Sequence, residues 1–171
     1  LDWKNGPKSW LRNPMNTTLK ELSHSKPILV SACLLGINCT YRGDSNLHPA
    51  VMQLLSRFTI IPICPEQLGG LCTPRTAAEI QSEKVIMKDG TDVTLHFARG
   101  AAETLRLAEL YGCKLAILKQ RSPSCGNGTI YDGSHQGRQI RGDGITTRRL
   151  REAGLAILSE EDLDTIKAGL K

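Results

Sequence analysis

The sequence predicts a single α/β domain whose open, mainly parallel sheet carries helices on both faces, a Rossmann-like arrangement. Short apolar runs of strand length alternate along the chain with segments whose apolar residues recur at helical spacing. Such alternation is typical of strand–helix–strand units that place their strands in one parallel sheet. The length of 171 residues is that of one ordinary domain, and no internal repeat or linker divides it.

Four apolar runs are expected to form the strands: residues 27–32, 58–63, 114–118 and 155–158. The first of them lacks polar alternation, as strands buried on both faces do. Pro62 cannot donate a hydrogen bond to a neighbouring strand, so the second strand is expected at an edge or to end there.

Helices are expected around these runs, over residues 17–25, 48–57, 92–111 and 145–153. The long helix starts at Asp92 or Thr94, which suit an N-cap, and is stopped by Gly112. A capping box of Ser159 and Asp162 predicts a last helix. Three further segments are expected to be loops or irregular, namely residues 65–75, 80–93 and 130–144. A small hairpin is expected around residues 88–90.

Composition limits the function classes. Residues 1–14 hold both tryptophans and are set apart as an N-terminal arm or a remnant of cloning, which leaves 15–171 as the domain.

The net charge of +5, from 22 basic and 17 acidic residues, suits an anionic small molecule without requiring one. Aromatic residues make up only 4%, which disfavours a nucleic-acid partner. No apolar run is long enough to span a membrane and no signal peptide is evident, so a cytoplasmic protein is expected; its oligomeric state is left open.

Six cysteines occur without any C-x-x-C pair, at positions 33, 39, 64, 72, 113 and 125. In a reducing compartment such cysteines are more often buried, metal-bound or catalytic than disulfide-linked. Cys33, Cys64 and Cys125 each follow a predicted strand. Ligands bind beyond the carboxyl ends of parallel strands, so these three are expected to meet there. Cys113 precedes its strand, and Cys39 and Cys72 lie further out in loops.

Three thiolates at one sheet edge predict a site for zinc, copper(I) or an iron–sulfur cluster. Iron–sulfur clusters normally take four cysteines, so three would leave one iron with an open position. The alternative is that each cysteine packs as a small apolar side chain. Neighbouring Pro, Ser, Gly and Glu residues favour the shared site.

Glu66 and Ser122 are candidate catalytic residues. Glu66 stands two residues after Cys64, where a carboxylate can act as a general base or remain a solvated loop residue. Ser122 and Ser124 can donate hydrogen bonds to a substrate or to cluster sulfur, or serve the turn around Pro123.

The later loops contain a candidate phosphate cradle, and the alternative is a mobile polar loop. Its residues are Asn127, Gly128, Gly137, Gly142 and Gly144, with Arg138 and Arg141. No histidine is assigned as a ligand.

Three motifs stand in order along the chain: Ser31-Ala32-Cys33-Leu34-Leu35-Gly36, then Cys64-Pro65-Glu66 with Gly69-Gly70-Leu71 and Thr73-Pro74-Arg75, then Ser122-Pro123-Ser124-Cys125-Gly126 with Ile130-Tyr131-Asp132-Gly133. They resemble the TudS-type 2-thiouracil desulfidases, a family long catalogued as a domain of unknown function. The resemblance runs from about Ile28 to Leu158. The family usually has Arg-Tyr-Asp-Gly after the first motif, where this chain has Thr-Tyr-Arg-Gly-Asp at 40–44.

The resemblance implies a 4Fe–4S cluster held by Cys33, Cys64 and Cys125, with one iron not bound by the protein. It implies removal of sulfur from thiolated uracil compounds of the 2-thiouracil, 4-thiouridine or 4-thio-UMP type, which gives a uracil or uridine product and sulfide. Glu66 and Ser122 match the family's acid–base pair, and Glu66 is expected to activate a water. The expected partner is a small thiopyrimidine, with or without a phosphate.

Two other functions are compatible with the same residues. One is an iron–sulfur enzyme that thiolates its substrate, although the lack of a G-x-x-x-x-G-K-S/T loop disfavours an ATP-driven form. The other is a non-catalytic metal- or nucleotide-binding α/β module, which predicts colourless protein and no need for Glu66.

Overall fold

A four-stranded parallel sheet forms the centre of the computed structural model, which describes residues 27–163. Its strands are β1 (Ile28–Ser31), β2 (Ile60–Ile63), β5 (Leu115–Leu118) and β8 (Ala156–Ser159). They lie in the order β2-β1-β5-β8, and each neighbouring pair is parallel. The predicted sheet is confirmed, and β2 is an edge strand, as Pro62 predicts.

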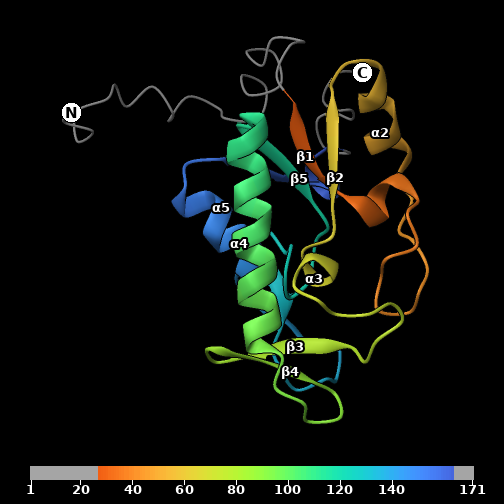
Figure 1. Cartoon of the computed structure of the whole chain (residues 1–171). Helices are drawn as coiled ribbons and strands as arrows, with labels where there is room; N and C mark the ends of the chain where they lie inside the picture. Colours follow the sequence, from red (N-terminus) through yellow and green to blue (C-terminus); the bar gives the residue numbers. More distant parts are fainter. Residues whose placement is uncertain (1–26, 164–171) are drawn as a thin grey trace, which may run out of the picture.

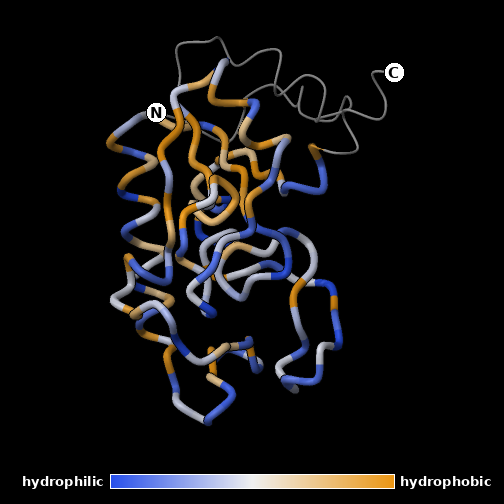
Figure 2. The backbone as a smooth tube through the Cα atoms, turned by 90° about the vertical axis from the view of Figure 1, so that its right-hand side faces the viewer, coloured by the Kyte–Doolittle hydropathy of each residue, from blue (hydrophilic) through white to orange (hydrophobic). Residues whose placement is uncertain are grey.

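Helices cover both faces of this sheet because successive side chains of each strand point to opposite sides. On one face, Val30 of β1 packs in a cluster with Val51 of the short helix α2 (Pro49–Met52). On the other face, Leu29 packs in a cluster with Leu150 of α5 (Ile145–Glu152). The hydrophobic stretches of the chain gather in these strands, as Figure 2 shows.

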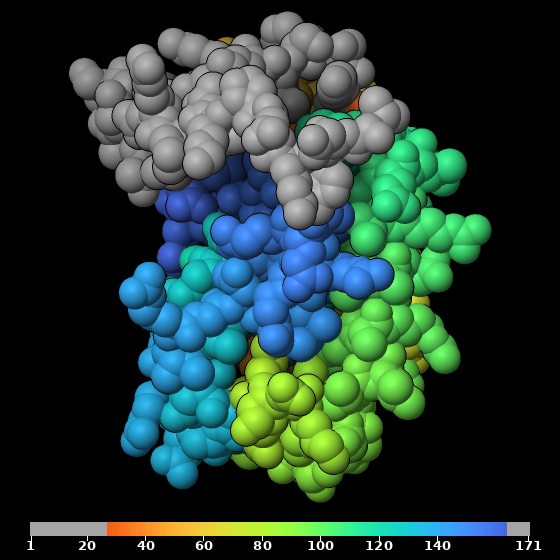
Figure 3. Space-filling model, turned by 90° about the vertical axis from the view of Figure 1, so that its left-hand side faces the viewer, coloured from red at the N-terminus to blue at the C-terminus, as the bar shows by residue number. Residues whose placement is uncertain are grey.

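The long helix α4 (Thr94–Tyr111) runs beside α5 on one side of the molecule (Figure 3). At its start, the carboxylate of Asp92 accepts hydrogen bonds from the backbone N–H and the hydroxyl of Thr94, at 3.0 and 2.6 Å. At its end, Gly112 has φ +67°, the left-handed conformation that favours glycine. The predicted end of this helix at Gly112 is therefore confirmed. The predicted N-cap is wrong, because Val93 occupies that position and Thr94 is the first helical residue.

Three segments expected to be irregular contain regular structure. Residues 65–75 begin with the short helix α3 (Pro65–Leu68). The other two hold antiparallel hairpins, made by β3 (Ala78–Gln81) with β4 (Lys84–Met87) and by β6 (Thr129–Tyr131) with β7 (Gln139–Arg141). These elements are three or four residues long, too short for a periodic pattern to emerge.

The structure also tests the expected helix over 48–57, the turn at 88–90 and the capping box at Ser159. The helix expected over 48–57 is divided into α2 and the 3-10 helix η4 (Gln53–Ser56). The turn expected at 88–90 is present, closed by a 2.9 Å bond from the N–H of Met87 to the carbonyl of Thr91. The capping box is confirmed, since the N–H of Ser159 donates to the carboxylate of Asp162 at 2.7 Å. The arm 1–14 and the helix expected over 17–25 lie outside the described residues.

Two glycines bring α3 and α4 into backbone contact. A Cβ on Gly69 would lie 2.0 Å from the carbonyl oxygen of His96, and one on Gly100 would lie 1.9 Å from that of Pro65. Neither position has room for a side chain, so main-chain atoms alone set the distance between the two helices.

The strand order also defines where a ligand binds. The chain leaves β1 toward β2 on one side and later returns to β5 on the other side, which creates a switch point at the carboxyl end of β1. In Figure 1, α3 lies just beyond the ends of these three strands. Between residues 27 and 163, no helix is both long enough and apolar enough to cross a membrane.

Candidate active site

A cavity of about 490 Å³ lies beyond the carboxyl ends of β1, β2 and β5. Its volume is within the range of small-molecule sites. The residues predicted from the sequence all line it, namely Cys33, Cys64, Glu66, Ser122 and Cys125.

The first two cysteines are placed by short helices that follow their strands. Cys33 lies in the 3-10 helix η3 (Ala32–Leu35), and its carbonyl accepts the N–H of Asn46 at 2.9 Å. Cys64 is the N-cap of α3, and its carbonyl accepts the N–H of Leu68 at 2.9 Å. Since β1 and β2 are neighbours, both side chains reach the cavity from the same sheet edge.

Cys125 reaches the cavity from a turn that Ser122 closes. The hydroxyl oxygen of Ser122 accepts the N–H groups of Ser124 and Cys125, each at 3.1 Å. Its carbonyl accepts the N–H of Gly126 at 2.8 Å, and a Cβ on that glycine would lie 2.8 Å from the same carbonyl. The hydroxyl of Thr147 anchors the turn to α5 through the carbonyl of Cys125 at 2.9 Å.

Ser124 is part of the scaffold. It is 1% exposed, and its hydroxyl lies 2.8 Å from that of Thr146 on α5. Its carbonyl accepts the N–H of Thr146 at 2.9 Å. Of the two serines in the motif, Ser122 lines the cavity and Ser124 joins the motif to the helix.

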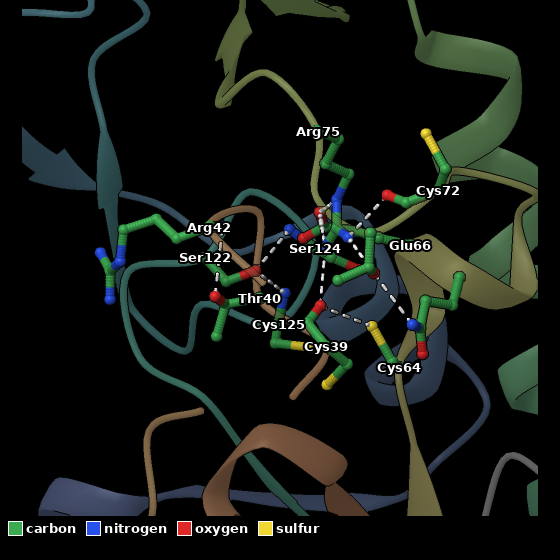
Figure 4. A network of polar contacts seen from close by, with 12 residues as sticks. Cys39, Thr40, Arg42, Cys64, Glu66, Cys72, Arg75, Ser122, Ser124 and Cys125 are labelled. Carbon is green, nitrogen blue, oxygen red and sulfur yellow. Dashed lines mark hydrogen bonds and ion pairs between the residues drawn. The ribbon is translucent and has the colours of Figure 1, made fainter. Parts of the chain in front are cut away.

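Cys39 lies at the cavity wall, although its position in the sequence suggested a place further out. It is 2% exposed, and its carbonyl accepts the Cys64 thiol at 3.7 Å (Figure 4). Cys72 is exposed and Cys113 is buried in the core beside α4, and neither lines the cavity.

The thiols at the cavity differ in acidity. Hydrogen bonding from Cys39 lowers the pKa of Cys33, and the same cause lowers the pKa of Cys64 to about 7. Burial raises the pKa of Cys125. Cys33 and Cys64 therefore lose their protons more easily than Cys125, and the thiolate is the form of cysteine that binds metals.

Glu66 is held by Arg75, a residue that lay within a quoted motif but received no role from the sequence. Nε of Arg75 donates to Oε2 of Glu66 at 2.7 Å. Nη2 of Arg75 lies 2.7 Å from the same oxygen and 3.1 Å from the carbonyl oxygen of Cys39. The side chains of Arg75 and Glu66 are 3% and 17% exposed, so this is a largely buried ion pair. No sequence pattern identifies the partner of a loop arginine.

The proposed phosphate cradle is wrong for most of its residues, because their N–H groups are bonded within the protein. Gly128 donates to the carboxylate of Asp143 at 2.7 Å, and Asn127 donates to the side chain of Gln120 at 2.9 Å. Gly142 and Gly144 donate to backbone carbonyls of the same loop. Gly137 does line the cavity.

His135 and Glu79 form part of the outer cavity wall, which sequence reasoning missed. The carboxylate of Glu79 accepts the N–H groups of Gly133 and His135, at 2.9 and 3.0 Å. This carboxylate fixes the turn that follows β6.

The three cavity thiols fit an iron–sulfur cluster by their chemistry. Between residues 27 and 163, no three His, Cys, Asp or Glu side chains gather closely enough to hold one ion. Cys125 interacts with Cys33 and Cys64 through charge, and the same holds between Cys33 and Cys64. Cysteine thiolates are the usual ligands of iron–sulfur clusters, so the donor set at this cavity fits such a group.

Comparison with known proteins agrees with this site. The 2-thiouracil desulfurase family matches residues 28–162. The uncharacterized protein YbbK of Bacillus subtilis (strain 168) is 40% identical over 149 residues, which cover 81% of this chain and 99% of YbbK.

Among solved structures, the [4Fe-4S]-dependent thiouracil desulfidase TudS matches with a TM-score of 0.78 and 41% sequence identity. The match covers 85% of this chain and 98% of TudS. A match of this extent confirms the predicted fold as well as the resemblance seen in the three motifs. The chain therefore belongs to the 2-thiouracil desulfurase family.

Proposed function

We propose that this protein is a 4Fe–4S-dependent desulfidase that hydrolyses the C–S bond of thiolated uracil compounds. The substrate class is 2-thiouracil or a 4-thiouridine or 4-thio-UMP type compound. The thiocarbonyl carbon gains oxygen from water and the sulfur leaves as sulfide, so the reaction needs no oxidant or reductant. Family membership supports desulfidation in general, and the cavity supports the assignment of residues.

One observation carries the proposal. Cys33, Cys64 and Cys125 follow three neighbouring parallel strands and line one cavity together with Glu66 and Ser122. Three cysteine ligands leave one iron of a 4Fe–4S cluster unbound by protein. Such a cluster supplies a Lewis-acidic iron that polarises the C–S bond of a bound substrate.

The protein's own groups handle water and protons. Glu66 is the general base, because its carboxylate reaches the cavity and can take a proton from the attacking water. Ser122 is the donor to the pyrimidine ring. Its oxygen already accepts two backbone N–H groups, which leaves its hydroxyl proton to be donated.

The test uses protein reconstituted anaerobically with iron and sulfide, then incubated with 2-thiouracil, 4-thiouridine or 4-thio-UMP. Hydrolysis predicts equal amounts of sulfide and oxo-pyrimidine, with ¹⁸O from labelled water in the product carbonyl. A thiolation enzyme would instead consume sulfide with the oxo-pyrimidine, and a binding module would release nothing.

Glu66→Gln is expected to lower the turnover of cluster-loaded protein by about 100-fold or more. Glu83→Gln is the matched control, since Glu83 is exposed between β3 and β4. Full turnover of Glu66→Gln at wild-type iron content would refute the assigned base.

A further inference from the structure

Every nitrogen of the Arg75 guanidinium has an acceptor within the protein. Nε donates to Glu66, and Nη2 pairs with Glu66 and the carbonyl of Cys39. Nη1 donates to the carbonyl of Cys72 at 3.1 Å and to the hydroxyl of Thr73 at 3.0 Å. The guanidinium thus makes four hydrogen bonds that involve all three of its nitrogens, and Nη2 also pairs with the Glu66 carboxylate.

These contacts decide how Arg75 can act. Although Arg75 lines the cavity, each of its three guanidinium nitrogens is already engaged by a protein acceptor. Its effect on a reaction must pass through the groups it holds. Of these, only Glu66 carries a charge, and its pairing with Arg75 is nearly shielded from water.

The two oxygens of Glu66 are therefore unequal. Both Nε and Nη2 of Arg75 bind Oε2. Among the residues that the structure describes, no donor is bonded to Oε1. An oxygen that already contacts two nitrogens of a guanidinium has less room for a water molecule than one that no protein donor reaches.

We propose that Arg75 is a positioning residue that selects Oε1 of Glu66 as the proton-accepting oxygen. This inference rests on the proposed role of Glu66 as general base. Arg75 turns the carboxylate by occupying Oε2 and fixes it relative to Cys39, whose carbonyl shares Nη2. The backbone N–H of Arg75 bonds the carbonyl of Tyr41 at 2.8 Å, which fixes the arginine to the same loop.

The planar fork of arginine is essential to this role. Lysine would keep the positive charge, but its compact ammonium cannot span Glu66, Cys39 and Thr73 in one plane. Arg75→Lys therefore separates charge from orientation. Lys84→Gln is the matched control, because Lys84 pairs with Asp92 at 3.3 Å on the exposed surface.

The test is a double-mutant cycle on cluster-loaded protein of equal iron content, with 2-thiouracil as substrate. Arg75→Gln is expected to lower kcat by about 100-fold with KM changed less than about twofold, since misplacing a catalytic group costs that much. Arg75→Lys is expected to recover less than a tenth of the lost rate. In the Glu66→Gln background, Arg75→Gln is expected to change kcat by no more than about twofold.

Other outcomes would overturn the inference or its premise. Multiplicative losses in the double variant, or a wild-type rate for Arg75→Lys, would show that Arg75 does not act by orienting Glu66. Full activity of Glu66→Gln would instead refute the proposed base while leaving the geometry of the pair intact. If Arg75→Gln fails to fold, the cycle is run with Arg75→Lys, for which the same non-additivity is expected.

Discussion

The hydroxyl oxygen of Ser122 lies 3.1 Å from the backbone nitrogen of Cys125. One serine thus closes the turn that presents an expected cluster ligand and also lines the cavity at that ligand's side. The lone pairs of this hydroxyl are used by the turn and its proton is not, so the proposed donation to a substrate would leave the support of the turn intact.

Ser122→Ala is expected to affect stability and turnover together. Two N–H groups lose their acceptor, which costs about 1–3 kcal/mol in the free energy of unfolding. Loss of the proton donor is expected to lower turnover by about 100-fold. Urea unfolding and sulfide release measure the two effects, with Ser56→Ala on the exposed surface as control. A stable variant with wild-type turnover would remove Ser122 from both roles.

The cysteines are expected to divide into ligands and bystanders. Replacing Cys33, Cys64 or Cys125 with serine should abolish the visible absorbance of the reconstituted cluster and reduce bound iron. Cys72→Ser should leave both unchanged, because Cys72 is exposed and outside the cavity lining.

Cys39→Ala tests whether a fourth cysteine binds the cluster, since Cys39 is a cavity thiol outside the expected ligand set. It is expected to retain the wild-type iron content. If it lost iron as Cys125→Ser does, the cluster would have four protein ligands and the open iron would not exist.

Asp92 is expected to make the free energy of unfolding depend on pH. Hydrogen bonds from Thr94 lower the pKa of Asp92 below its usual 3.8, so the folded state favours the ionised carboxylate. That contribution is present at neutral pH and is lost as the pH falls below about 4 through the lowered pKa. Asp92→Asn should therefore be less stable than wild type at pH 7, with the difference shrinking near pH 2. Chemical denaturation at the two pH values measures it; a gap that is constant with pH would contradict the assignment.

Gly100→Ala is expected to be destabilising although alanine is the better helix former by about 1 kcal/mol. The new Cβ would meet the carbonyl of Pro65, so α3 must shift, and overpacking of this kind costs about 1–3 kcal/mol. Cys64 and Glu66 move with α3, so iron content and turnover should fall as well. Ala102→Gly, at an exposed position of the same helix, should cost only the helix propensity and leave turnover intact.

The central strands could be predicted because they are short runs of apolar residues. The helix α4 could be predicted because it is long enough to show helical periodicity. Leu115–Leu118 is buried at every residue, and α4 ends at a glycine. The β3–β4 hairpin was missed for a physical reason. The β3–β4 turn places Ser82 at φ +58°, without the Asn-Gly or Asp-Gly pair that usually marks such a turn.

The site was predictable where it follows strand ends and unpredictable where loops fold back. Cys33 and Cys64 could be placed because the carboxyl ends of parallel strands share an edge. Cys39 and Arg75 could not, since 36 residues separate them in the sequence and only the fold brings carbonyl and guanidinium together. Tertiary contacts between loops have no local signature.

The contact of Gly69 and Gly100 has a consequence for engineering. Attempts to adapt the cavity to other thiolated heterocycles will naturally vary the residues that line it, and neither glycine does. Yet any side chain at these positions displaces the helix that carries Cys64 and Glu66. Redesign must therefore keep Gly69 and Gly100, although neither lines the cavity, because their close backbone contact holds α3 and its two cavity residues in place.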